Sequence, residues 1–178
     1  MKKVLFFLLL VILVLFLYLT KTDKYDFTLL GEDNKTYSLK DFENEKIIIY
    51  FGYTSCPDVC PATLSMLSKE LKKIQKQAKI VFISLDLEND NDINLSTQWL
   101  KYFYENSIFL LAKNEEYLKN LSKRYGVIYE KIPQKDSALK YTVAHSSYLF
   151  LFDNAKFIER IDNFSQKNLS QRLREFLE

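Results

Sequence analysis

Two cysteines with three residues between them are the clearest sign of chemistry in this sequence. Cys56 and Cys60 are the only cysteines among its 178 residues. They follow an apolar run, Ile47 to Phe51, that is typical of a buried strand, and a helical pattern begins directly after them. A helix N-terminus favours thiolate, because its amide groups are unpaired and carry partial positive charge. The position therefore indicates a reactive or metal-binding pair rather than two packing residues.

The spacing of the pair leaves three kinds of site open. Thioredoxin-type redox motifs have two residues between the cysteines, one fewer than here. With Pro61 as the first helical residue, Cys60 is predicted to be the N-cap and Cys56 to lie in the loop before it. Sulfurs placed in this way could bind one soft metal ion or close into a redox disulfide. The third alternative is a structural disulfide in an exported protein.

Three further side chains are candidates for the same site. His145 is the only histidine, and it is predicted at the entrance to a strand, Tyr148 to Phe152. A single histidine is more often structural, but a metal site at the cysteines would need a third ligand. Asp86 and Asp90 follow another apolar strand, at the edge of a sheet where α/β proteins tend to bind ligands. The alternative for these two acids is a solvated loop that caps the next helix.

The remaining pattern predicts an α/β fold with a parallel sheet that is covered on both faces. A β-hairpin is expected from Asp26 to Leu39. Lys131 to Ser137 is expected to be a polar excursion. The further predicted strands are Lys46–Phe51, Ile80–Leu85, Phe109–Leu111 and Phe157–Ile161, and the predicted helices are Ala62–Gln75, a segment around Trp99, Glu115–Tyr125 and Ser165–Leu177.

The N-terminus predicts a membrane anchor. Lys2 and Lys3 precede an unbroken apolar run from Val4 to Leu19, which spans about 24 Å as a helix. No signal-peptidase or lipidation site follows, so residues 1–20 are expected to stay attached as a single transmembrane helix. The two lysines favour a bacterial inner membrane with one domain, residues 21–178, in the periplasm. A net charge of +2 without a basic stripe excludes nucleic acid as the partner.

From about Tyr25 to its end the chain resembles the SCO/SenC family. The resemblance is carried by the segment Phe51 to Pro61, by Asp86 and Asp90, and by His145-Ser146. It implies a thioredoxin-like fold with an added hairpin, a membrane anchor, and copper bound by Cys56, Cys60 and His145. It also implies a partner, the copper-centre subunit of cytochrome c oxidase. Two departures are Ala144, where many relatives have an acid, and a divergent stretch, residues 133–139.

The donor chemistry agrees with this resemblance. Two thiolates and an imidazole suit Cu(I) and accept Cu(II), whereas a structural zinc site would ask for a fourth protein ligand. The leading hypothesis is a copper chaperone for the binuclear centre of the oxidase, with Asp86 and Asp90 in a supporting role. The alternative is an enzyme, a thiol–disulfide oxidoreductase that reduces the oxidase cysteines, and a redox or copper sensor is a third. Other periplasmic copper carriers or thiol reductants are further expected partners.

Overall fold

The computed structural model describes residues 6–7, 10–11, 23–134, 140–162 and 164–178. The predicted anchor, residues 1–20, lies almost entirely outside these ranges. Within them, no helix is long and apolar enough to cross a membrane.

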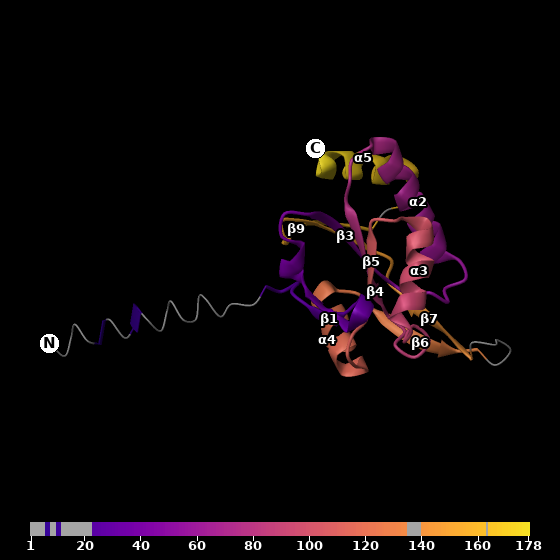
Figure 1. Cartoon of the computed structure of the whole chain (residues 1–178), viewed down its shortest axis with the longest axis horizontal. Helices are drawn as coiled ribbons and strands as arrows, with labels where there is room; N and C mark the ends of the chain where they lie inside the picture. Colours follow the sequence, from indigo (N-terminus) through magenta and orange to yellow (C-terminus); the bar gives the residue numbers. More distant parts are fainter. Residues whose placement is uncertain (1–5, 8–9, 12–22, 135–139, 163) are drawn as a thin grey trace.

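A five-stranded sheet in the order β5-β4-β3-β8-β9 forms the centre of the domain (Figure 1). Its strands are β3 Lys46–Gly52, β4 Lys79–Ser84, β5 Ser107–Leu110, β8 Leu149–Asp153 and β9 Lys156–Ile161. β3, β4 and β5 run parallel, but β8 is antiparallel to both β3 and β9. The predicted parallel arrangement is therefore confirmed for β3, β4 and β5, whereas β8 and β9 make the sheet mixed, because a connection as short as that between β8 and β9 can join only antiparallel strands.

Helices cover both faces of the sheet, as predicted. They are α2 Val59–Ile74, α3 Ile93–Phe103, α4 Glu115–Tyr125 and α5 Gln166–Leu177, and α5 packs beside α2 (Figure 1). On one face Trp99 of α3 meets the ring of Phe82 edge-on. On the other face Tyr125 of α4 contacts Phe51 and Phe150. All of these rings except that of Trp99 are almost fully buried, so the two faces form one continuous aromatic core.

Two short hairpins accompany the sheet. The predicted N-terminal hairpin is confirmed as β1 Thr28–Leu30 paired with β2 Thr36–Ser38. A second hairpin, β6 Tyr129–Pro133 paired with β7 Tyr141–His145, was not predicted. The expected polar excursion is wrong for residues 131–133, which belong to β6, and residues 135–139 lie outside the described ranges. The second hairpin forms a separate two-stranded sheet, and it carries the histidine.

Candidate metal centre

Both cysteines lie at the connection between β3 and α2. Cys56 is in the loop, and Cys60 is the second residue of the helix, whose N-cap is Asp58. The prediction that Cys60 is the N-cap is wrong, because the helix begins two residues before Pro61. Proline is tolerated there, since amides of the first turn have no partner within the helix. The Cys60 amide is one of these, and it donates a hydrogen bond to Cys56 Sγ over 3.4 Å.

Gly52, the last residue of β3, makes room for the sulfur of Cys60. A methyl group on Gly52 would lie 2.8 Å from Phe82 Cζ and 3.0 Å from Cys60 Sγ, so one neighbour would have to move. Cys60 is fully buried, whereas Cys56 is partly exposed. The end of the strand therefore holds one sulfur inside the domain and leaves the other near its surface.

His145 reaches the buried sulfur from 85 residues further along the chain, with Nε2 3.6 Å from Cys60 Sγ. It is the last residue of β7, whereas the sequence predicted it at the entrance to the following strand. Its other ring nitrogen, Nδ1, lies 3.0 Å from the carbonyl oxygen of Ser146. Because a carbonyl oxygen can only accept, Nδ1 carries the hydrogen. Nε2 is therefore the nitrogen that faces the sulfur, and in the neutral form of the ring it carries the lone pair.

Tyr53 orients the imidazole from the side of the cysteine loop. Its ring meets that of His145 edge to face, with centroids 6.0 Å apart. Its hydroxyl is hydrogen bonded to Thr142 Oγ1 of β7 at 2.9 Å. Tyr53 was not among the predicted site residues, and its place just before the cysteines is the only signal that the sequence offers.

The two thiols differ in acidity. The hydrogen bond from the Cys60 thiol holds the pKa of Cys56 well below its ordinary value of 9.0, and it outweighs partial burial. Hydrogen bonds from the amides of Cys60 and Asp58 act in the same direction. The shared hydrogen bond and burial both raise the pKa of Cys60. Cys56 is therefore the thiolate of the pair, as expected beside a helix N-terminus.

The separation of Cys60 and His145 suits two ligands of one ion. Bonds of about 2.3 Å to sulfur and about 2.1 Å to nitrogen, at a tetrahedral angle, put the donor atoms about 3.6 Å apart. Cys56 Sγ accepts from the Cys60 amide instead, and in the described ranges no three His, Cys, Asp or Glu side chains already surround one metal position. Cys60 and His145 thus stand at the spacing of two ligands of one ion, and Cys56, the third predicted ligand, lies in the loop just before Cys60.

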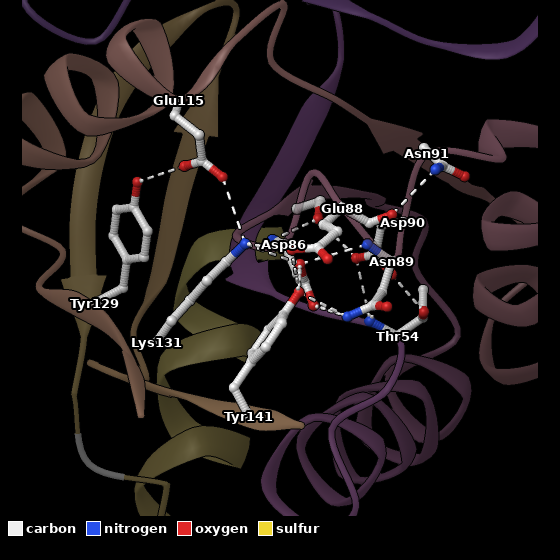
Figure 2. A network of polar contacts seen from close by, with 11 residues as sticks. Thr54, Asp86, Glu88, Asn89, Asp90, Asn91, Glu115, Tyr129, Lys131 and Tyr141 are labelled. Carbon is white, nitrogen blue, oxygen red and sulfur yellow. Dashed lines mark hydrogen bonds and ion pairs between the residues drawn. The ribbon is translucent and has the colours of Figure 1, made fainter. Parts of the chain in front are cut away.

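Asp86 and Asp90 lie in the turn after β4, and both are buried, with exposed fractions of 1% and 0%. Asp90 accepts hydrogen bonds from the Thr54 amide at 3.2 Å and from the Ser84 hydroxyl at 2.6 Å. Asp86 accepts one from the Tyr141 hydroxyl at 2.7 Å (Figure 2). The alternative of a solvated loop is therefore wrong for both acids, which bond to the cysteine loop on one side and to β7 on the other.

Lys131 of β6 supplies the positive charge of this cluster. Its ammonium lies 3.5 Å from Asp86 and 3.6 Å from both Glu88 and Glu115 (Figure 2). Burial alone would raise the pKa of Asp86, but hydrogen bonds, led by that of Tyr141, and the charge of Lys131 together lower it. Lys131 was missed because residues 131–137 were predicted to be a polar excursion, and the sequence offered no reason to single out Tyr141.

Comparison with known proteins places this chain in a family. The model of the SCO1/SenC family matches residues 19–178. The chain belongs to the SCO1/SenC family. A SCO2-like protein of Rickettsia felis is 31% identical over 157 residues, which cover 85% of this chain and 74% of that protein.

Solved SCO structures share the fold. Arabidopsis thaliana ScoI with copper bound is 29% identical, with a TM-score of 0.76 over 84% of this chain and 94% of that one. Yeast Sco1 with copper bound is 25% identical, with a TM-score of 0.73 over 84% of this chain and 85% of that one. The predicted family and the thioredoxin-like α/β fold are thus confirmed.

Ala144, one of the two departures noted from the sequence, lies on β7. It is exposed and pairs with Glu130 across the hairpin. Successive residues of a strand point to opposite faces, so residue 144 faces away from the side on which His145 meets the sulfur. An acid at position 144 would therefore project from the same face of β7 as Thr142, not from the face that carries His145.

Proposed function

We propose that this protein is a membrane-anchored copper chaperone that delivers copper to the binuclear centre of cytochrome c oxidase. Copper is the cargo, and Cys56, Cys60 and His145 hold it. The copper-bound relatives from Arabidopsis and yeast support this assignment. So does the donor set, since two sulfurs and an imidazole suit Cu(I) and accept Cu(II).

The observation that carries the proposal is the approach of His145 Nε2 to Cys60 Sγ at 3.6 Å. With Nδ1 donating to a carbonyl, the lone pair of Nε2 is free for a metal. Cys56 completes the set by turning its sulfur from the Cys60 amide toward the same ion. Two thiolates around Cu(I) carry a net charge of −1, and around Cu(II) they form a neutral site.

The exposure of the ligands suits a protein that passes its metal on. Cys60 is fully buried, whereas Cys56 and His145 are partly exposed. A partner thiol or imidazole can therefore replace the two outer ligands one at a time while Cys60 still holds the ion. The copper-centre subunit of the oxidase is the proposed acceptor, and other periplasmic copper carriers are proposed donors.

The test is anaerobic copper titration of the reduced full-length protein and of its His145→Ala variant. Loss of a group that only orients a metal ligand weakens metal binding by up to about 100-fold. Because His145 is a direct ligand in this proposal, its loss should weaken copper binding by more than that. Thiol–disulfide exchange should stay largely intact, since both cysteines remain. X-ray absorption should show sulfur and nitrogen ligands in the parent protein, and the nitrogen contribution should be missing from the variant.

Stoichiometric copper bound with unchanged affinity by His145→Ala would contradict the proposed site. Cys56→Ser and Cys60→Ser are the matched comparisons, because each should lose both copper binding and thiol exchange. No other histidine can replace the imidazole, since the chain has one.

A second function is favoured by the unequal thiols. A partly exposed thiolate next to a buried thiol is the arrangement of an attacking and a resolving cysteine. The Cys56 thiolate would attack a partner disulfide and release one partner thiolate. Cys60, after giving up its proton, would then displace the second partner sulfur, leaving a Cys56–Cys60 disulfide and a reduced partner. Retention of this exchange in His145→Ala, with copper binding lost, separates the two functions.

A further inference from the structure

The groups that would hold copper come from two separate parts of the fold. The cysteines lie at the connection between β3 and α2, and His145 lies at the end of the hairpin β6–β7, which in the described ranges has no strand pairing with the central sheet. Copper affinity therefore depends on what holds this hairpin against the loop. Besides the packing of buried Val143 and the hydrogen bond between Tyr53 and Thr142, the link runs through the turn that contains Asp86 and Asp90.

One end of this link is the cysteine loop. Asp90 accepts hydrogen bonds from both the amide and the hydroxyl of Thr54, which lies two residues before Cys56. It also accepts one from Ser84 at the end of β4, so the loop is fastened to the rigid sheet. Asp90 is fully buried, and in that setting such bonds are strong and their loss is costly.

The other end of the link is the hairpin. Asp86 accepts from the hydroxyl of Tyr141 on β7 at 2.7 Å and lies 3.5 Å from the ammonium of Lys131 on β6. The ammonium also stands over the Tyr141 ring, 4.7 Å from its centroid. One carboxylate thus binds both strands of the hairpin (Figure 2). Tyr141 and His145 are four residues apart on one strand and share a face, so fixing the first fixes the direction of the second.

We propose that Tyr141 and Lys131, bound to Asp86, are positioning residues that hold His145 at the cysteine loop. The name carboxylate clamp is used below for four residues, Asp86, Asp90, Lys131 and Tyr141. The expected effect on copper affinity rests on the proposed function. The positioning of His145 itself is a property of the metal-free protein. It gives the two acids predicted to support the site a specific role, which is to join the two ligand-bearing segments without touching the metal.

The test is Tyr141→Phe in the full-length protein. The change removes the hydroxyl that binds Asp86 and keeps the ring beneath Lys131. Copper affinity, measured anaerobically by competition, should fall about 10- to 100-fold, as for other groups that orient a metal ligand. In the metal-free protein, nitrogen NMR of the single histidine should change from one tautomer, protonated at Nδ1, to a mixture.

Tyr117→Phe is the matched control. The Tyr117 hydroxyl accepts a hydrogen bond from the Thr28 amide at 2.7 Å, and Lys113 stands over its ring, 5.4 Å from the centroid. The control therefore also loses a hydrogen-bonded hydroxyl from a ring beneath a lysine, but outside the clamp, whereas the Tyr141 hydroxyl contacts Asn89 and Glu88 besides Asp86. It should leave copper affinity and the histidine signal unchanged, and denaturant unfolding should show whether the stability loss of the two variants is similar.

An unchanged histidine signal in Tyr141→Phe would overturn the clamp, and so would an unchanged copper affinity in a parent protein that binds copper. Should the parent protein bind no copper, the proposed function fails, while a tautomer change confined to Tyr141→Phe still supports positioning. If Tyr141→Phe does not fold, Lys131→Gln takes its place, because that side chain is partly exposed. It should change the histidine signal in the same direction, and an unchanged signal would overturn the clamp.

Discussion

The chemistry of this protein depends on a few residues whose roles follow from their immediate contacts. Cys56 is the thiolate because the Cys60 thiol donates to it, and His145 offers Nε2 because Nδ1 is bound to a carbonyl. Gly52 has no functional group, yet the buried sulfur occupies the space that a larger residue would need. Such a role follows only from packing.

Gly52→Ala should disturb the site more than it disturbs the fold. The added methyl group would press on Phe82 and on Cys60 Sγ, so overpacking should cost about 1–3 kcal/mol of unfolding free energy. Displacement of the sulfur from His145 should also weaken copper binding. Denaturant unfolding measures the first effect and anaerobic competition the second.

Gly31→Ala is the control for this prediction. A methyl group there would lie 2.6 Å from Tyr37 Cε2 and 3.1 Å from Leu110 Cδ2, with no sulfur nearby. A similar loss of stability with normal copper binding is expected. Equal copper affinity in the two alanine variants would show that Gly52 has no particular role at the sulfur.

At the scale of elements, the site is assembled from a strand end, a helix start, a turn and a hairpin. β3 and β4 are parallel neighbours, so their carboxyl ends lie at one edge of the sheet. The cysteines that follow β3 therefore meet the acids that follow β4. The sequence predicted this edge correctly. It missed the hairpin β6–β7, because Val143 is the only buried residue of the two strands, which lack the apolar alternation of a half-buried strand.

The turn after β4 should give the protein a pH-dependent stability term. Asp86 has a pKa below its ordinary value of 3.8, so its charged form stabilises the fold. That contribution is present above about pH 4 and is lost as the pH falls through the lowered pKa. Asp86→Asn should cost about 1–3 kcal/mol near pH 7, and the difference from the parent protein should shrink below pH 4.

Denaturant unfolding from pH 3 to pH 8 would measure this difference. Asp162→Asn is a suitable control, because Asp162 is exposed and its ion pair with Arg160 should contribute less than about 1 kcal/mol. A gap between Asp86→Asn and the parent protein that stays constant down to pH 3 would show that the charge of Asp86 does not stabilise the fold.

At the scale of the whole molecule, we propose that the N-terminal run holds the domain at the outer face of a bacterial inner membrane. The run from Val4 to Leu19 contains no charged residue, and Lys2 and Lys3 before it favour a cytoplasmic N-terminus. The domain would then meet oxidase subunits within a short reach of the bilayer.

Cell fractionation tests the anchor. The full chain should stay in the membrane pellet through carbonate washing and be released by detergent, because the proposed anchor would insert about 24 Å of apolar helix. A chain with an export signal in place of residues 1–20 should appear in the soluble periplasmic fraction. Release of the full-length protein without detergent would instead indicate cleavage of the run.

The sequence by itself determined the elements whose patterns are local. Apolar runs of strand length gave the central strands, 3.6-residue periodicity gave the helices, and the family motif around Cys56 and Cys60 singled out the chemistry. These features need only neighbouring residues to be recognised. The N-cap was misplaced by two positions, because proline fits several places in the first turn of a helix.

Only the tertiary structure decided how the distant parts meet. The approach of His145 to Cys60 depends on a hairpin whose register no local pattern shows. Likewise, the burial of Asp86 and Asp90 arises because Tyr141, Lys131 and Thr54 satisfy their charges and hydrogen bonds from other elements. A carboxylate can be buried when such partners arrive together, and that requires the folded chain.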